Sequence, residues 1–310
     1  MDKNSKIFIA GHKGMVGSAI VRKLQKEGYH NLVTVSKSGV DLRNQEAVNT
    51  WFQYNNPEYV FLAAAKVGGI LGNSTYPAEF IYDNLQIQNN VIHCSHLFKV
   101  KKLLFLGSSC IYPKHADQPI KEDYLLDGKL ESSNEAYAIA KIAGLKMCQF
   151  YNKQYGSNFI SCMPTNLYGE YDNFHPTNSH VIPGLIHRFV EARKNKAPAI
   201  QCWGTGSAMR EFLYVDDMAD ACITLMKKYE DCTETINVGT GTDISIKELV
   251  VMISSYVGYT GKIEWDTTKP DGTPRKVLNV DKIKSLGWEP KHSLKEGLLK
   301  SISWYIANKV

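Results

Sequence analysis

A phenol and an ammonium stand one helical turn apart in the segment Tyr137-Ala138-Ile139-Ala140-Lys141. At this spacing the two groups share a helix face, and we expect the cation to lower the pKa of the phenol. Ser108 and Ser109 lie upstream, where a buried-strand pattern ends and where open α/β sheets bind ligands. These residue types suit hydride transfer to a carbonyl. A serine hydroxyl would polarise the oxygen, Tyr137 would protonate it, and Lys141 would hold a nicotinamide ribose.

Three glycines, Gly11, Gly14 and Gly17, follow the first apolar run and open a helical pattern. Glycines in this position let the backbone approach a pyrophosphate, and the exposed N–H groups of a helix N-terminus favour an anion. The spacing is G-x-x-G-x-x-G rather than G-x-G-x-x-G, so its position in the chain carries most of the prediction. We expect this loop to bind a dinucleotide.

The second apolar run ends Val35-Ser36-Lys37-Ser38, without the carboxylate that usually holds the ribose of NAD. Lys37, together with Lys13 in the glycine loop, could neutralise a 2′-phosphate, so the sequence favours NADPH. In the alternative reading both lysines are solvated and Asp41 binds a ribose or contacts the adenine region.

Short apolar runs alternate with helix-length segments through the first half of the chain. The predicted strands are Lys6–Ala10, Leu32–Val35, Val60–Ala64, Leu103–Leu106 and Phe159–Met163. The predicted helices are Met15–Glu27, Gln45–Tyr54, Phe80–Phe98 and Glu135–Tyr155. This βαβ rhythm is typical of a doubly wound parallel sheet, the Rossmann architecture.

After Pro164 the rhythm loosens, and a helix at Ile182–Arg193 and a strand at Ile200–Trp203 suggest a second lobe. A strand-then-helix pattern over Arg210–Tyr229 and a buried strand at Ile236–Val238 return to the first lobe. We therefore expect interleaved lobes: residues 1–165 plus about 210–238 bind the dinucleotide, and about 166–209 plus 239–310 form a smaller α/β substrate lobe.

The composition, with 44% hydrophobic, 22% charged and 11% aromatic residues among 310, is typical of a globular protein. The net charge of +5 is small and dispersed, so we expect no nucleic-acid partner. No apolar run is long enough for a membrane span, and no signal-peptide pattern is visible. Seven cysteines without a C-x-x-C pair suggest neither zinc nor a redox dithiol. We expect a cytoplasmic protein without a bound metal.

Over nearly its whole length the chain resembles the extended short-chain dehydrogenase/reductase family, and within it the branch that forms GDP-L-fucose. The similarity lies in the stretches AGHKGMVGSAI, AAAKVGGI, LFLGSSCIYP, EAYAIAKIAG, MPTNLYG, DNFHPTNSHVIP and KPDGTPRK. The resemblance implies an NADP(H)-dependent enzyme that epimerises GDP-4-keto-6-deoxy-D-mannose at C3 and C5 and reduces it at C4. It also implies a homodimer formed through two long helices, here Phe80–Phe98 and Glu135–Tyr155.

The resemblance makes Ser108, Tyr137 and Lys141 the reductase triad and gives Cys110 and His180 the places of the epimerase base and acid. Without it, Cys110 reads as a core cysteine and His180 as a loop or helix-cap histidine. With the residues named above, the expected cofactor site comprises Gly11, Lys13, Gly14, Met15, Val16, Gly17, Lys37, Asp41, Leu42, Ala63, Ala65, Leu106, Lys141, Pro164, Asn166, Leu167 and His180. The expected contacts to the GDP-sugar are Ser109, Asn166, Arg188, Trp203, Arg210 and Asp271.

The chain departs from the family pattern at two places. Gly169-Glu170-Tyr171 replaces a Gly-Pro start, which we expect to reshape the sugar pocket near C5 and C6. Lys13 and Lys37 stand where arginines are common, so charge is kept but two-pronged hydrogen bonding is lost.

Two other readings remain open. One is a reductase of a related GDP-4-keto sugar, such as a heptose, without epimerase activity. The other is a non-catalytic NADP-sensing protein, although such a protein usually loses the tyrosine or the lysine. A dehydratase is disfavoured, because Cys110 and Ile111 follow Ser109 where an Asp-Glu pair would be needed.

Overall fold

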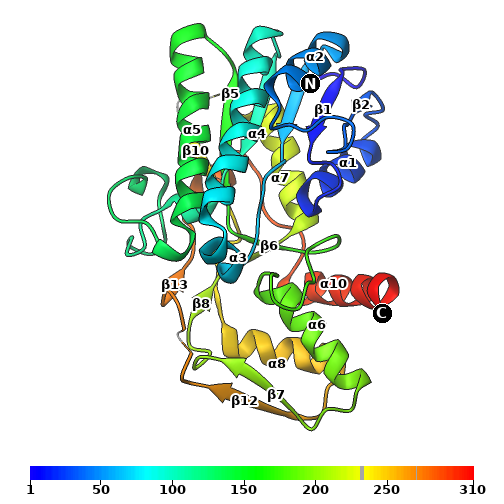
Figure 1. Ribbon diagram of the computed structural model, residues 1–310, viewed down its shortest axis with the longest axis vertical. Coiled ribbons are helices and arrows are strands. Elements are labelled where there is room, and N and C mark those ends of the chain that lie inside the picture. The colour runs from blue at the N-terminus through cyan, green and yellow to red at the C-terminus, as the bar shows by residue number, and fades with distance from the viewer. Residues whose placement is uncertain (231–233, 270) are drawn as a thin grey trace.

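A computed structural model describes residues 1–230, 234–269 and 271–310. Cys232 lies outside the described residues. The centre of the molecule is a six-stranded parallel sheet with strand order β10-β5-β4-β3-β1-β2 (Figure 1). Its strands are β1 (Ile7–Ala10), β2 (Leu32–Val33), β3 (Tyr59–Leu62), β4 (Lys102–Leu106), β5 (Phe159–Pro164) and β10 (Thr235–Val238). The predicted doubly wound fold is confirmed.

The strands of this sheet are buried along most of their length because helices cover both faces. The helices that pack around it are α1 (Met15–Lys26), α2 (Gln45–Asn55), α4 (Pro77–Leu97), α5 (Glu135–Tyr155) and α7 (Val215–Lys228), together with the short α3 (Ile70–Thr75). Helix α4 packs along α5, and α1 packs along α7. Most residues of these strands are therefore apolar, which is why the sequence predicted the strands of the central sheet.

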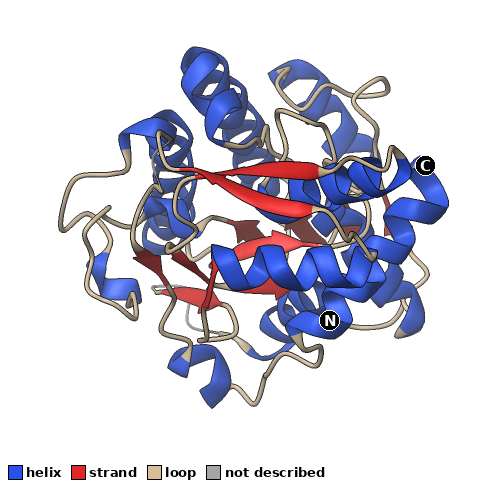
Figure 2. Ribbon diagram, turned by 90° about the horizontal axis from the view of Figure 1, so that it is seen from below, coloured by secondary structure: helices blue, strands red, loops and turns tan. Residues whose placement is uncertain are grey.

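A smaller group of elements lies below the sheet in Figure 1. It contains α6 (Val181–Lys194), α8 (Ile246–Val257) and α10 (Leu294–Lys309), with the parallel pair β7 (Ala199–Trp203) and β12 (Lys262–Asp266). A three-stranded sheet of β11 (Ile244–Ser245), β8 (Met209–Arg210) and β13 (Arg275–Lys276) lies beside them. Seen from below, strands run through the middle of the molecule and most helices lie around them (Figure 2).

Short elements connect the two parts. Strand β6 (Asn166–Tyr168) pairs in parallel with β9 (Phe212–Tyr214), a pairing that runs of three residues are too short to reveal in sequence. The remaining elements are three short 3₁₀ turns, η1 (Ser109–Ile111), η2 (Glu122–Tyr124) and η3 (Ser132–Asn134), and the helix α9 (Asp281–Ser285). Strand β2 is shorter than predicted and ends at Val33.

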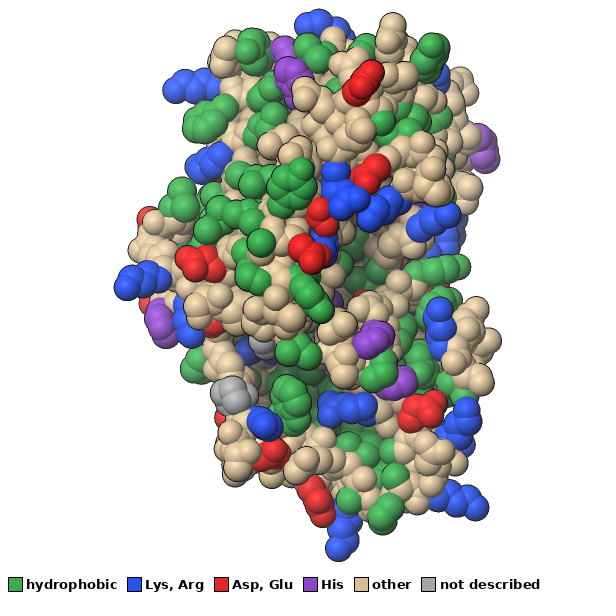
Figure 3. Space-filling model, viewed as in Figure 1, with side chains coloured by type: hydrophobic (Ala, Val, Ile, Leu, Met, Phe, Trp, Pro, Cys, Tyr) green, Lys and Arg blue, Asp and Glu red, His purple; other side chains and the backbone are tan. Residues whose placement is uncertain are grey.

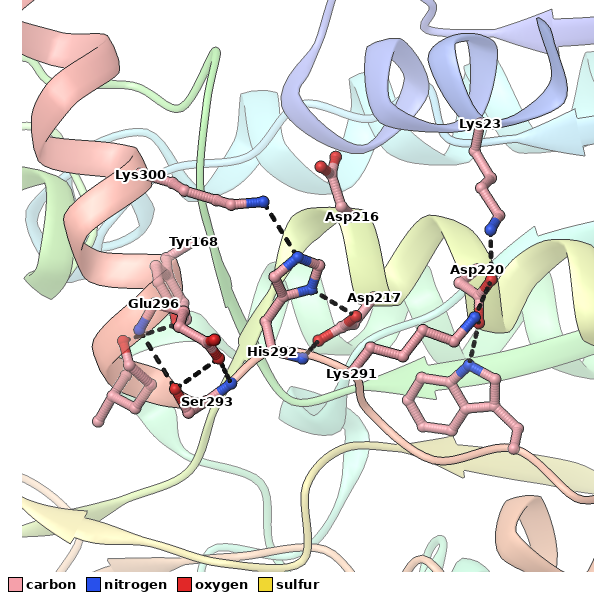
Figure 4. Close-up of polar contacts among 12 residues, drawn as sticks. Lys23, Tyr168, Asp216, Asp217, Asp220, Lys291, His292, Ser293, Glu296 and Lys300 are labelled. Carbon is pink, nitrogen blue, oxygen red and sulfur yellow. Dashed lines mark hydrogen bonds and ion pairs between the residues drawn. The ribbon is translucent and has the colours of Figure 1, made fainter. Parts of the chain in front are cut away.

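Acidic side chains of α7 connect it to α1 and to the segment that precedes α10 (Figure 4). Asp217 accepts hydrogen bonds from the His292 backbone and pairs with its ring, each at 2.9 Å. Asp220 contacts Lys23 of α1 at 2.7 Å and Lys291 at 3.0 Å. These contacts connect α1, α7 and the chain that enters α10.

Two general properties of the described residues bear on function. None of the helices formed by them has the length and apolar character that a membrane span requires. Within the same residues no group of three or more His, Cys, Asp or Glu side chains is arranged to hold a metal ion.

Candidate active site

Ser108 and Tyr137 meet at the carboxyl edge of the central sheet. Ser108 follows β4, and its hydroxyl accepts a hydrogen bond from the Cys110 backbone N–H at 3.2 Å, which begins η1. Tyr137 lies in the first turn of α5 and forms a hydrogen bond with Ser108. The ring of Phe80 lies edge-on to the Tyr137 ring, with centroids 6.5 Å apart. A strand end and a helix start therefore bring two hydroxyl groups together.

Burial determines the acidity of the Tyr137 phenol. Loss of water around the hydroxyl raises its pKa well above the ordinary value, and a nearby negative charge on Cys110 would raise it further. The hydrogen bond with Ser108 acts in the opposite direction. The expectation that Lys141 lowers the pKa of the phenol is wrong for this structure, because desolvation dominates. At neutral pH the phenol stays protonated.

Lys141 is buried one turn further along α5. Its Nζ donates a hydrogen bond to the Leu106 carbonyl at 2.8 Å and lies 5.7 Å from the centroid of the Tyr137 ring. Burial lowers its pKa to about 8. The ammonium therefore faces the sheet edge with donors to spare, as a residue that holds a ribose would require.

Cys110 lies in η1, two residues after Ser108. Its Sγ accepts a hydrogen bond from Asn134 Nδ2 at 3.2 Å and contacts Lys276 Nζ at 3.8 Å. Sequence reasoning missed both partners. Asn134 immediately precedes α5, the helix that carries Tyr137, and this position could have suggested Asn134 as a site residue. Nothing in the sequence places Lys276 of β13 beside a cysteine that follows β4.

His180 stands at the N-terminal boundary of α6, as its reading as a helix-cap histidine expected, although its side chain forms no capping hydrogen bond. The residue is open to solvent along one side, yet the protein surrounds its ring closely enough that burial lowers its pKa. Both descriptions fit a residue in the wall of a cleft. In the space-filling view the surface is hollowed between the sheet and the smaller part below it (Figure 3).

The unusual Gly169-Glu170-Tyr171 segment starts the loop that leads to His180. Tyr171 has a positive φ of 64°, and its ring lies 5.0 Å from the ring of Trp304 in α10. Arg22 lies over the same ring at 5.4 Å and pairs with Glu170 at 3.6 Å. The observed contacts of this segment are thus with α1 and α10. The segment can change the sugar pocket only by changing the path of the loop that leads to His180.

The glycine loop packs tightly against neighbouring backbone, which only glycine permits at two of its positions. A Cβ on Gly11 would lie 2.7 Å from the Ala64 backbone nitrogen, and one on Gly17 would lie 2.1 Å from the Gly11 oxygen. Gly14 is the N-cap of α1, so no side chain occupies the first free N–H groups, and the first turn has no acidic residue. His12 Nδ1 is buried without a hydrogen-bond partner in the described structure. This donor set fits a pyrophosphate.

The two lysines expected near a 2′-phosphate, Lys13 and Lys37, are both exposed. Asp41 pairs with Arg43 at 2.6 Å, and this pairing lowers the Asp41 pKa to about 2. Arg43 also contacts Asp83 at 3.0 Å. Sequence reasoning did not select Arg43, although it follows Asp41 by two positions. Its planar cation is held between Asp41 and Asp83 in the segment that follows β2.

The other expected cofactor residues lie along the same edge of the sheet. Met15 and Val16 begin α1, Leu42 accepts a hydrogen bond from Asn90 through its carbonyl at 2.9 Å, and Leu106 ends β4. The remaining ones follow β3 or end β5 and form β6: Ala63, Ala65, Pro164, Asn166 and Leu167. The Asn166 amide donates to the Glu211 carbonyl at 2.8 Å, which fixes its orientation.

The expected substrate contacts are more scattered. Ser109 is buried in η1, and Arg188 on α6 donates to the Gln201 carbonyl at 3.2 Å. Trp203 has 66% of its surface exposed at the end of β7. Arg210 donates to the Met209 carbonyl at 2.7 Å, and burial lowers its pKa.

Asp271 differs from the other expected substrate contacts because its carboxylate is already engaged. It accepts hydrogen bonds from the Thr205 backbone at 2.7 Å, from the Thr205 hydroxyl at 2.8 Å and from the Gly206 backbone at 3.3 Å. These bonds join two loops of the smaller part. Arg210 lies near the same loop, with its guanidinium 3.5 Å from the Cβ position of Gly272.

Comparison with known proteins gives consistent results. The model of the NAD dependent epimerase/dehydratase family matches residues 7–239. GDP-L-fucose synthase 1 of Arabidopsis thaliana is 57% identical and covers 99% of this chain and 95% of that protein. GDP-L-fucose synthase of Escherichia coli K12 is 52% identical, with 98% and 97% covered. The structure of a GDP-mannoheptose C4 reductase from Campylobacter jejuni with NADP bound has a TM-score of 0.90 and 42% identity over 99% of each chain.

Proposed function

The chain belongs to the NAD dependent epimerase/dehydratase family, and we propose that it converts GDP-4-keto-6-deoxy-D-mannose to GDP-L-fucose. It is an oxidoreductase whose cofactor is NADP(H). One observation carries the proposal: a phenol, a serine hydroxyl and a thiol meet at a single site, where Tyr137 is hydrogen-bonded to Ser108 and Cys110 lies in the short turn that Ser108 begins.

The reduction uses three residues. NADPH, when bound along the glycine loop, supplies a hydride to C4 of the sugar. Ser108 donates a hydrogen bond to the C4 oxygen, and Tyr137 gives that oxygen a proton. Burial keeps the phenol protonated until the oxygen gains charge, and Lys141 holds the nicotinamide ribose through its free N–H donors.

The epimerisation uses the same ketone. Hydrogens on the carbons that flank C4 are acidic, because loss of a proton gives an enolate that Ser108 stabilises through its oxygen. Cys110 removes the proton from one face, and His180 returns a proton to the other. Because burial lowers the His180 pKa, its imidazolium form gives up a proton readily.

The remaining roles follow the positions of the side chains. Residues 1–165 and about 210–238 form the cofactor-binding domain, and about 166–209 with 239–310 form the substrate lobe. Arg188 and Arg210 bind the diphosphate, with Trp203 against a base or sugar face. Asp271 holds the two loops that carry these contacts, since its carboxylate is hydrogen-bonded to Thr205. The enzyme acts in the cytoplasm.

We also propose a homodimer formed through α4 and α5. These two helices pack along each other and leave several large apolar or aromatic side chains exposed on the outer surface of the molecule. The exposed residues are Tyr82, Leu97, Ile139, Phe150 and Tyr155. Apolar side chains gathered on adjacent helices are typical of a surface covered by a second subunit.

Deuterium labelling tests the function. The protein is incubated with GDP-4-keto-6-deoxy-mannose in deuterated water, with and without NADPH, and the product is analysed by mass spectrometry and NMR. We expect deuterium at C3 and C5. Reduction of the ketone without label at either carbon would show that Cys110 and His180 do not epimerise this substrate.

The similarity to the Campylobacter jejuni GDP-mannoheptose C4 reductase supports a second candidate, a C4 reductase of a GDP-4-keto-heptose without epimerase activity. The two candidates share the reductase residues and differ in whether Cys110 and His180 transfer protons. Competition between the two ketones, followed by NADPH oxidation and by label at C3 and C5, separates them. Faster reduction of the heptose without label favours the second candidate.

A further inference from the structure

Lys276 is a half-buried cation without a carboxylate partner among the described residues. Its neighbour Arg275 pairs with Asp243 at 2.6 Å. The Asp243 carboxylate is therefore bound to Arg275 and not to Lys276. Its Nζ lies 3.8 Å from the Cys110 sulfur. A lysine ammonium in this position is best satisfied by a negative sulfur.

The backbone around Lys276 is fixed on both sides, so the starting point of its side chain is held in place. Lys276 pairs with Arg210 across β8 and β13, and its carbonyl accepts a hydrogen bond from the Glu211 N–H at 3.3 Å. The next residue, Val277, donates its N–H to Gln118 at 2.8 Å. The strand therefore fixes the Lys276 Cα within reach of Cys110, and the flexible side chain brings the ammonium to the sulfur.

The second contact of the sulfur comes from a different element. Asn134 donates its amide N–H to Cys110 Sγ at 3.2 Å and lies three residues before Tyr137. The sulfur is thus approached by an amide from the start of α5 and by an ammonium from the smaller lobe. Both groups donate hydrogen bonds and favour the negative form of the sulfur over the neutral thiol.

We propose that Lys276, assisted by Asn134, stabilises the Cys110 thiolate and thereby makes this cysteine the base of the epimerisation. This inference rests on the proposed function and names a positioning residue for it. In the step, the C–H bond beside the ketone breaks, its proton forms an S–H bond with Cys110, and the electron pair enters the enolate. His180 protonates the opposite face, and both groups then exchange protons with water, so no net proton is consumed.

The placement of Lys276 also links the two halves of the reaction. A thiolate at Cys110 raises the pKa of the Tyr137 phenol and so helps to keep that proton in place during epimerisation. Because Lys276 belongs to the smaller lobe and Cys110 follows β4, the thiolate is stabilised when the two lobes are correctly packed.

Alkylation of Cys110 tests the proposal without any sugar substrate. The ligand-free protein is treated with iodoacetamide at neutral pH, and modification of the Cys110 peptide is followed by mass spectrometry. We expect Lys276→Gln to slow this modification about tenfold, since the thiolate is the reacting form. Lys276→Arg should keep most of the rate, and Lys262→Gln, at an exposed lysine of β12, should keep all of it.

Deuterium exchange at C3 and C5 then separates the possible failures. We expect Lys276→Gln to slow exchange while reduction of an already epimerised ketone continues. Unchanged Cys110 alkylation in Lys276→Gln overturns the inference. If this variant instead shows a raised KM for the GDP-sugar, Lys276 is a substrate-binding residue. If Lys276 controls alkylation but the unmodified protein gives no exchange, stabilisation of the Cys110 thiolate by Lys276 stands, and the epimerase function and the role of Cys110 as its base fail.

Discussion

At the residue scale, the site combines groups whose properties come from burial rather than from charge alone. Tyr137 and Lys141 are neighbours on one helix face, yet their pKa values move in opposite directions. Burial disfavours the charged form of each group, which is the deprotonated form of the phenol and the protonated form of the amine. The phenol stays protonated and the ammonium becomes easier to deprotonate. These directions suit a proton donor beside a ribose-binding cation.

Replacement of Tyr137 by phenylalanine removes the proposed proton donor but keeps the ring that packs against Phe80. We expect NADPH oxidation with the keto sugar to fall by at least about a hundredfold, the usual range for loss of a general acid. Deuterium exchange at C3 and C5 should continue at a similar rate, because Cys110 and His180 remain. Equal loss of both activities would contradict separate roles.

Replacement of Lys141 by methionine removes a buried charge. The Lys141 pKa falls from 10.5 to about 8 on folding, so between these values the unfolded chain binds more protons and the native protein gains stability as pH rises. We expect Lys141→Met to increase the free energy of unfolding by on the order of 2 kcal/mol below pH 8. The advantage should shrink from pH 8 upward in urea titrations.

Lys262→Met serves as the control for this titration, since Lys262 is exposed on β12. It should change stability little at any pH. A Lys141→Met protein that is less stable than the parent near neutral pH would show that the Leu106 hydrogen bond outweighs the cost of burying the ammonium.

At the scale of elements, helix α10 supports the loop that leads to His180. Its N-terminus carries a capping box formed by Ser293 and Glu296, and Tyr168, just before the loop, donates to the Leu294 carbonyl at 3.4 Å (Figure 4). Trp304 lies against Tyr171 and, with centroids 5.8 Å apart, against Phe174. The helix thus contacts the loop at its start and along its first half.

Replacement of Trp304 by alanine should loosen this loop. We expect the free energy of unfolding to fall by about 2 kcal/mol, because the residue is half-buried and makes two ring contacts. Trp304→Phe should restore most of it. Leu299→Ala, at an exposed position of the same helix, is the matched control. Equal urea midpoints for Trp304→Ala and the control would show that these ring contacts do not support the loop.

At the scale of the whole molecule, the exposed residues of α4 and α5 bear on assembly. Phe150 has 61% of its surface exposed, and Val251 on α8 has 55%, so the two positions are comparable as single residues. They differ in their surroundings, because Phe150 shares its helix with Ile139 and Tyr155, two further exposed large side chains.

Replacement of Phe150 by glutamate should therefore convert a dimer to a monomer, since a charge in the centre of an apolar interface loses its water without gaining a partner. Sedimentation velocity measures the change. Val251→Glu should leave the dimer intact. A parent protein that sediments as a monomer at micromolar concentration would contradict the proposed assembly.

The sequence by itself determined the central sheet, the glycine loop and the Tyr137–Lys141 pair. Strands covered on both faces are mostly apolar, and the residues on one face of a helix recur every three or four positions. Both patterns can therefore be recognised from residues close together in the sequence. The end of α5 at Tyr155 was predicted to the residue, whereas the β6–β9 pairing was missed because each partner is three residues long.

Only the tertiary structure decided which distant residues contact the site residues and how far burial shifts their pKa values. Cys110 and Lys276 are separated by 166 positions, and Asp217 and His292 by 75, so no local pattern could place them together. The direction of the Tyr137 pKa was predicted wrongly for the same reason: the spacing reveals the nearby cation, but the water lost around a hydroxyl depends on every element packed over it. Periodicity is a property of adjacent residues, whereas desolvation and long-range contact are properties of the packed chain.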